Sequence, residues 1–253
     1  MQLRVVDAGP AEPHLQANLI SYVINEQVAI DAGALGLLPL REQQRLRAVF
    51  VSHSHADHIA TLPMLIDNVY CPGPECLKVY GHEATLRDLQ HHIFNDRIWP
   101  DVLQLAAADS PFVEFQPVVH GQTIDIAGLR ITPFEVNHTL PSLGFVIEER
   151  QAAVAVVADT APCDAIWEFL ADFEQLRAVF LEISFPNRLQ WLADVAKHLT
   201  PNSFLAETRK LATPVTWYIT HTKLEHSEAI SCEVAELQIP NCKFAMGGEC
   251  YRF

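Results

Sequence analysis

Short apolar runs recur along the chain at the length of β-strands, and polar or turn-forming residues separate them. Runs of this length and spacing are typical of strands. The run from Ala178 to Leu181 is apolar at every position, which is typical of a strand covered on both faces. Strands are predicted over residues 3–6, 18–24, 28–31, 48–51, 77–80, 112–119, 131–136, 144–147, 153–157, 178–181 and 215–219.

Apolar residues at helical spacing predict helices between these strands. Thr200-Pro201 is typical of an N-cap followed by proline at the first helical position, and predicts a helix running toward Leu211. Two sets of strands with interspersed helices predict two sheets covered by helices. The other helices are predicted over residues 41–47, 59–65, 83–94, 166–176 and 230–237.

The 253 residues, 49% of them hydrophobic and 19% charged, are enough for a substantial core. No linker or low-complexity tract divides them, so we expect one domain over residues 1–253. The N-terminus lacks a signal-peptide pattern, and no apolar run approaches the ~20 residues of a membrane span. We therefore expect a cytoplasmic protein without membrane contact. The role of the six scattered cysteines stays open, with free thiols preferred to disulfides.

The formal net charge is −14, with only 17 lysines and arginines spread along the chain. Nucleic-acid binders neutralise phosphates with clustered basic residues, so nucleic acid is not expected as a partner. A small anion attracted by a bound metal remains compatible with this charge.

The segment from His53 to His58 follows the predicted strand 48–51 with the pattern H-x-H-x-D-H. Its three imidazoles and one carboxylate suit zinc, manganese or iron better than calcium or magnesium. The alternative is a polar loop that is merely rich in histidine. Clusters of this density and ligand spacing are rare by chance, so we interpret the segment as a metal site.

Three more candidate ligands, His138, Asp159 and His221, each come just after a predicted strand. A lone histidine in such a place is more often a packing residue. Strand ends at one edge of a sheet converge, however, so the repeated pattern predicts that these residues share the site of the H-x-H-x-D-H segment.

Together with Asn137-His138, Asp159-Thr160 and Thr220-His221-Thr222-Lys223, this segment resembles the metallo-β-lactamase superfamily in its phosphodiesterase branch. The resemblance implies an αββα four-layer sandwich of the α/β class with a two-metal site between its sheets. Segments over nearly the whole chain are similar to the class II 3′,5′-cyclic-nucleotide phosphodiesterase family. They are Asn18-Leu19, Ser21-Tyr22, Asp31-Ala32-Gly33, residues 93–95 and 98–100, Pro141-Ser142, residues 182–185, residues 198–201 and residues 221–223.

The chain departs from that family at Ala56, where leucine is usual, and at Leu143-Gly144, where a more polar pair is expected. Both positions concern nucleotide preference, so the choice between cAMP, cGMP and another phosphodiester stays open. The tRNA 3′-processing endonucleases share H-x-H-x-D-H and a segment like residues 159–164. They bind tRNA through an additional arm that has no basic counterpart here, so the cyclic-nucleotide interpretation is preferred.

The resemblance also implies residue roles. His53, His55 and His138 would hold one metal, Asp57, His58 and His221 the other, and Asp159 would bridge them. The cofactors are two divalent ions, with Zn²⁺ preferred to Mn²⁺ or Fe²⁺. A hydroxide between the metals would attack a 3′,5′-cyclic phosphate and release the 5′-monophosphate. The implied catalytic residues are Asp57, Glu182 and His198.

Glu182 and His198 would form a carboxylate–imidazole pair that protonates the leaving group. In the alternative interpretation, Glu182 binds backbone groups and His198 ends a helix. Lactone or thioester hydrolysis, or nucleotide binding without turnover, are the rival functions. The family further suggests a homodimer.

Five residues are candidate substrate contacts. Phe94 and Trp99 could stack on a purine, Asn95 could bind a base edge, Ser142 lies near the expected pocket, and Lys223 could contact phosphate. The alternatives are core aromatics and an exposed lysine.

Overall fold

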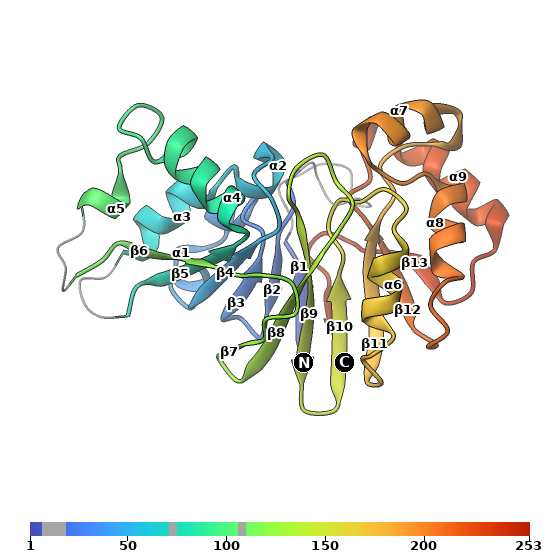
Figure 1. Ribbon diagram of the computed structural model, residues 1–253, viewed down its shortest axis with the longest axis horizontal. Helices are drawn as coiled ribbons and strands as arrows, with labels where there is room; N and C mark the ends of the chain where they lie inside the picture. Colours follow the sequence, from blue (N-terminus) through green and yellow to red (C-terminus); the bar gives the residue numbers. More distant parts are fainter. Residues whose placement is uncertain (7–18, 71–74, 106–109) are drawn as a thin grey trace.

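The computed structural model describes residues 1–6, 19–70, 75–105 and 110–253. Two mixed sheets stand face to face, and helices cover the outer face of each (Figure 1). This is the α/β four-layer sandwich expected of the metallo-β-lactamase fold, so the predicted fold class is confirmed. Asn18, the first residue of the predicted strand 18–24, lies outside the described residues.

The first sheet contains the N-terminal strands and the last strand of the chain, in the order β14-β1-β2-β3-β4-β5-β6. Pairs from β14 to β3 are antiparallel, and pairs from β3 to β6 are parallel. Its strands are β1 (Gln2–Val5), β2 (Tyr22–Ile24), β3 (Val28–Ile30), β4 (Ala48–Val51), β5 (Leu77–Gly81), β6 (Val113–Pro117) and β14 (Cys250–Arg252).

The second sheet repeats this arrangement in the order β13-β12-β11-β10-β9-β8-β7. Pairs from β13 to β10 are parallel, and pairs from β10 to β7 are antiparallel. Its strands are β7 (Ile124–Ile126), β8 (Leu129–Glu135), β9 (Leu143–Glu149), β10 (Ala152–Val156), β11 (Leu176–Glu182), β12 (Thr216–Thr220) and β13 (Cys242–Phe244).

Helices α1, α3, α4 and α5 lie on the side of the first sheet, and α6, α8 and α9 on the side of the second (Figure 1). Within the described residues, no helix combines the length and apolarity needed to cross a bilayer. The helices are α1 (Leu40–Gln43), α2 (Ala56–Ile59), α3 (Leu62–Val69), α4 (Glu83–Asp88), α5 (Val102–Leu105), α6 (Asp164–Leu170), α7 (Gln190–Ala196), α8 (Pro201–Thr208) and α9 (Ser227–Leu237). Short 3-10 helices span Leu35–Leu37, Asn187–Leu189 and Leu224–His226, and a π-helix spans Leu89–Ile93.

Three apolar clusters follow from the alternation of side chains along the strands. The central cluster joins the inner faces of both sheets, where Tyr22 meets Phe180 edge-on and Phe50 meets Phe145 edge-on. The other two clusters fill the spaces between each sheet and its helices. The run from Ala178 to Leu181 in β11 is buried at every position, as predicted, because its side chains alternate between the central cluster and the cluster behind the second sheet.

Most predicted elements are present with shifted ends. The Thr200 N-cap is confirmed, because its side chain accepts a hydrogen bond from the Ser203 N–H in a capping box that opens α8. The helix predicted over 166–176 is too long, since α6 ends at Leu170 and Leu176 already starts β11. Strands β7, β13 and β14 and helix α7 were not predicted, because these segments are short or lack a clear apolar period.

Candidate metal centre

All candidate ligands follow strand ends at one edge of the two facing sheets. His53 and His55 follow β4, and α2 presents Asp57 and His58. From the second sheet, His138 follows β8, Asp159 follows β10 and His221 follows β12. The structure therefore brings all seven candidate ligands to one place, at the seam between the sheets.

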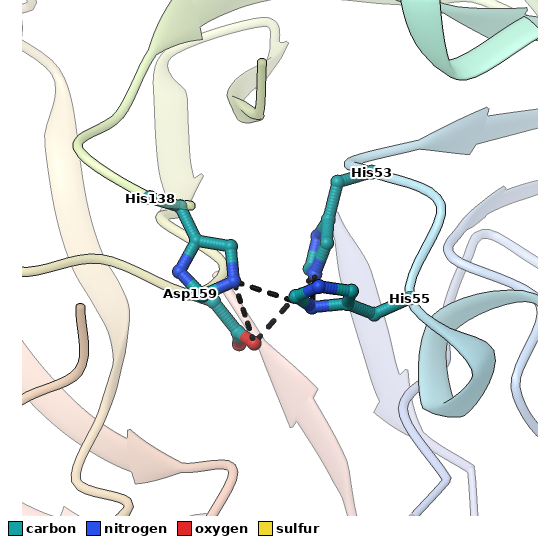
Figure 2. Close-up of side chains that lie close together, drawn as sticks. All are labelled: His53, His55, His138 and Asp159. Atoms are coloured by element: carbon teal, nitrogen blue, oxygen red, sulfur yellow. Dashed lines mark hydrogen bonds and ion pairs between the residues drawn. The ribbon is translucent and has the colours of Figure 1, made fainter. Parts of the chain in front are cut away.

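The first group of ligands consists of His53, His55, His138 and Asp159, whose ligand atoms all lie within 4.8 Å of one another (Figure 2). His53 Nε2 is 2.9 Å from His55 Nδ1, and His138 Nε2 is 3.3 Å from the same atom. Asp159 Oδ2 lies 3.7 Å from His53 Nε2. Three imidazoles and one carboxylate thus converge around a space of the size of a metal ion.

The second group consists of Asp57, His58 and His221, whose ligand atoms also all lie within 4.8 Å of one another. His221 Nε2 lies 3.1 Å from Asp57 Oδ2 and 3.4 Å from Asp159 Oδ1. His58 Nε2 lies 3.4 Å from Asp159 Oδ2. Asp159 therefore faces both groups, as a bridging ligand must.

The polar atoms at the centre fit a pair of cations. Asp159 is 1% exposed, and its Oδ1 and the Nε2 of buried His58 have no hydrogen-bond partner. Buried polar atoms without partners are costly, and a metal ion between them would satisfy both. The donor set of imidazole and carboxylate is also that of zinc, manganese and iron sites.

Asp31 and Ser52 orient the histidines of the first sheet. Asp31, just after β3, accepts hydrogen bonds from the Ser52 N–H (2.7 Å), the Ser52 hydroxyl (2.9 Å) and His58 Nδ1 (2.7 Å). The Ser52 hydroxyl oxygen in turn accepts from His53 Nδ1 at 3.0 Å. These bonds leave Nε2 of both rings directed at the centre, the arrangement that partners of metal-bound histidines commonly impose.

Glu182 and Ser184 orient His221 in the second sheet. The Ser184 hydroxyl donates to Glu182 Oε2 at 2.6 Å and accepts from His221 Nδ1 at 2.9 Å. His138 Nδ1 donates to the main-chain carbonyl of Lys197 at 3.0 Å. His55 differs from the other four histidines, because its Nδ1 faces the centre.

Burial and charge act in opposite directions on the central groups. Burial raises the pKa of the Asp159 carboxyl, but His221 and His58 hold that pKa well below its usual range. Burial lowers the pKa of His58, and Asp159 and Asp31 outweigh it and raise that pKa. For His53, burial dominates and lowers the pKa, which favours the neutral, ligating form of the ring.

Comparison with known proteins gives the family. Residues 5–222 match the profile described as "Beta-lactamase superfamily domain". The chain belongs to the metallo-β-lactamase superfamily. The predicted resemblance is thus confirmed at the level of the superfamily.

The curated relatives of this metallo-β-lactamase-fold chain include proteins named as cyclic-nucleotide phosphodiesterases and proteins named as ribonucleases. A probable 3′,5′-cyclic-nucleotide phosphodiesterase of Yersinia pestis is 27% identical over 67% of this chain and 52% of its own length. A ribonuclease Z of Mycobacterium bovis is 27% identical over 61% of this chain and 55% of its own length. The chain spans about half the length of the curated relatives it matches. Among solved structures, unliganded yeast PDE1 superposes with a TM-score of 0.79 at 16% identity, covering 98% of both chains.

Glu182 and His198 form a buried pair beside the ligands. Glu182 Oε1 accepts hydrogen bonds from His198 Nδ1 at 2.6 Å and from the Thr160 N–H at 3.0 Å. Burial lowers the pKa of His198, but the Glu182 carboxylate outweighs it and raises that pKa. The His198 ring stacks on His221 with centroids 5.6 Å apart, so a protonated imidazole would lie next to the centre.

The structure gives less support to the predicted substrate contacts than to the candidate metal ligands. Phe94 is fully buried in the cluster behind the first sheet, where it meets Phe115 edge-on, so stacking of a base on Phe94 is a wrong prediction. Trp99 is half-buried against the same cluster. The Asn95 side chain closes its own turn, with Oδ1 accepting from the Arg97 and Ile98 N–H groups.

Ser142 and Lys223 lie nearer the ligands in sequence and space. Ser142 is buried, and its hydroxyl donates to the Leu140 carbonyl. The Lys223 ammonium lies 5.3 Å from the centre of the Phe185 ring, and that ring is 5.7 Å from His198. Of the five, Lys223 and the half-buried Trp99 remain candidates for substrate contacts.

Asp31, Ser52, Ser184 and Lys197 were not assigned roles from the sequence. Asp31 and Ser52 each follow a strand directly, as the candidate ligands do, so the same pattern could have found them. No sequence signal marks Lys197, because its contact with His138 joins residues 59 positions apart.

Proposed function

We propose that this chain is a dinuclear-metal phosphodiesterase that hydrolyses 3′,5′-cyclic nucleotides to 5′-monophosphates. The observation that carries the proposal is the position of Asp159 between two ligand groups, with the Glu182–His198 pair beside them. Two metals of this kind polarise a phosphoryl group and supply a nucleophile from water at neutral pH. Zn²⁺ is the proposed occupant, since the first group holds three imidazoles.

The protein's own residues would orient the reaction. Asp31 and Ser52 on one side, and Glu182 and Ser184 on the other, fix the ligand rings before substrate binds. Pre-formed geometry of this kind lowers the cost of reorganisation in the reaction.

His198 would supply the proton that the leaving oxygen needs. Its Nδ1 is hydrogen-bonded to Glu182, so Nε2 is the ring nitrogen that can transfer a proton. The adjacent carboxylate favours the protonated ring, and a positioned imidazolium assists departure of an alkoxide. The need for a proton donor distinguishes cleavage of a phosphodiester that expels an alkoxide from reactions whose leaving group departs without a proton.

Two observations favour a small substrate. The Yersinia pestis relative and one from Aliivibrio fischeri carry the name of a cyclic-nucleotide phosphodiesterase. The net charge of −14 also opposes binding of a polyanion. The relatives named ribonuclease Z support a second candidate, endonucleolytic cleavage at the 3′ side of tRNA precursors.

The test measures hydrolysis of cAMP, cGMP, 2′,3′-cAMP, bis(p-nitrophenyl) phosphate and a 3′-extended tRNA precursor by metal-reconstituted protein. We expect a 3′,5′-cyclic nucleotide to give its 5′-monophosphate. Asp159→Asn should abolish turnover and reduce bound metal, whereas Asp125→Asn, at an exposed carboxylate of β7, should change neither. Cleavage of the precursor alone would replace the proposal with the second candidate. Turnover of bis(p-nitrophenyl) phosphate alone would retain the metal centre and refute the cyclic-nucleotide assignment.

A further inference from the structure

His138 is carried by the connection between β8 and β9. Its neighbour Asn137 fixes one side of this connection to the segment after Asp159. The Asn137 N–H donates to Thr160 Oγ1 at 3.2 Å, and its carbonyl accepts from the Ala161 N–H at 2.8 Å. These bonds hold the backbone before His138, but none of them orients the imidazole itself.

Lys197 contacts His138 from the opposite side, through two separate groups. The main-chain carbonyl of Lys197 accepts from His138 Nδ1 at 3.0 Å, and the Lys197 ammonium donates to the His138 carbonyl at 2.9 Å. The first bond sets the direction of the ring, and the second sets the position of the backbone that bears it. Lys197 thus bonds both the ring of this candidate ligand and the backbone that bears it.

The backbone of Lys197 has a conformation that serves this double contact. It ends α7 in the left-handed region, with φ 56° and ψ 57°, where a residue with a β-carbon is strained. The following residue, His198, bonds Glu182. Two consecutive residues therefore present a carbonyl to His138 and an imidazole to Glu182.

Among the described residues, the lysines paired with carboxylates are Lys78 and Lys210, and the Lys197 ammonium has no such partner although the protein carries a net charge of −14. The ammonium donates its hydrogen bond to a neutral carbonyl beside the candidate centre. A positive charge in this place repels a divalent cation, so its presence is unfavourable for metal binding by charge alone.

We propose that Lys197 is a positioning residue for His138, and that its side chain raises the affinity of the first ligand group for metal. This inference rests on the metal centre of the proposed function, but it does not depend on the substrate. If Lys197 positions His138, replacing it with a neutral residue should weaken metal binding. If only its positive charge matters, the same replacement should strengthen metal binding. A lysine that is a bystander would make metal binding tighter when it is replaced by a neutral residue.

The experiment measures metal affinity without turnover. Protein stripped of metal is titrated with Zn²⁺ in competition with a chromophoric chelator, and Co²⁺ absorption reports the ligand geometry of the first site. The variants are Lys197→Asn and Lys197→Arg. Asparagine tolerates the left-handed conformation but lacks the ammonium, and arginine retains a cationic donor. Lys243→Asn is the matched control, since Lys243 lies in β13 over the Tyr218 ring and loses the same charge.

We expect Lys197→Asn to weaken binding of one of the two ions by about 10- to 100-fold and to change its Co²⁺ spectrum. The second ion should bind within about threefold of wild type, and the unfolding midpoint of the metal-free protein should not fall. Lys197→Arg should recover most of the lost metal affinity, and Lys243→Asn should bind both ions as tightly as wild type.

Unchanged or tighter binding in Lys197→Asn would overturn the inference, as would equal weakening of both ions or failure of Lys197→Arg to recover. A wild type that takes up no metal would refute the metal centre and this role together. A wild type that binds two ions but hydrolyses no phosphodiester would refute the proposed function alone.

Discussion

The assignment of Glu182 and His198 as a proton-donating pair predicts an effect that depends on the leaving group. A 3′,5′-cyclic nucleotide expels an alkoxide, which must be protonated, whereas bis(p-nitrophenyl) phosphate expels a p-nitrophenolate, which leaves without a proton. Removing the proton donor should therefore slow hydrolysis of the first substrate far more than that of the second.

The size of the effect follows from the contacts. His198→Ala removes the donor, which is worth about 10²- to 10⁴-fold for general acid catalysis. Glu182→Gln keeps the shape but removes the charge that faces His198 Nδ1 at 2.6 Å. A hydrogen bond to a charged group contributes about 1.5–3 kcal/mol, so the expected loss is roughly 10- to 150-fold. For bis(p-nitrophenyl) phosphate we expect less than about a tenfold loss in either variant.

The assay compares kcat for both substrates in proteins with verified metal content. Metal content matters because Glu182 also supports His221 through Ser184. His92→Ala, at an exposed histidine of the π-helix, is the control and should leave both rates unchanged. Equal losses on the two substrates at full metal occupancy would refute the assignment and return Glu182 and His198 to a structural role.

Two further predictions concern pH and packing. Burial lowers the pKa of His198, but the Glu182 carboxylate outweighs burial and raises it. Because the protonated ring is the active form, activity on substrates that expel an alkoxide should fall as pH rises through this pKa, and in Glu182→Gln the fall should occur at lower pH. A pH–rate profile whose alkaline limb does not move in the variant would contradict this prediction. A β-carbon at Gly33 would lie 2.0 Å from the main-chain carbonyl oxygen of Asp57, so Gly33→Ala should lower the free energy of unfolding by roughly 1–3 kcal/mol and weaken metal binding. Urea unfolding measures the first effect and chelator competition the second. An unchanged unfolding midpoint would contradict the prediction, because it would show that the backbone next to Asp57 moves without cost.

The sequence predicted the convergence of the candidate ligands and most of the strands, because both depend on local patterns. His138, Asp159 and His221 come directly after apolar runs, and strand ends at one sheet edge converge whatever the details of packing. The two-sheet architecture follows from the same runs. The ends of elements and the short edge strands β13 and β14 did not follow, since three residues carry too little periodicity.

Contacts between distant elements could not be predicted in the same way. Phe94 shows the limit for substrate contacts: its helical spacing with Leu86 and Leu89 defines a face that packs on the core, and the structure buries all three. The pattern identified the buried face of the helix correctly, and the error lay in assigning Phe94 on that face to the substrate. The link between Lys197 and His138 depends on where α7 docks, which no local pattern encodes.

The groups that orient the ligands are divided between the two halves of the molecule. Asp31 and Ser52 belong to the first sheet, Glu182 and Ser184 to the second, and in each half a strand-end carboxylate accepts from a serine that holds a ligand histidine. Asp159, from the second sheet, reaches His53 and His58, from the first. Neither sheet therefore forms the centre alone, and its geometry depends on how the sheets pack. The apolar core between the sheets, which includes the edge-on contact of Phe50 with Phe145, therefore also brings the two halves of the candidate metal centre together.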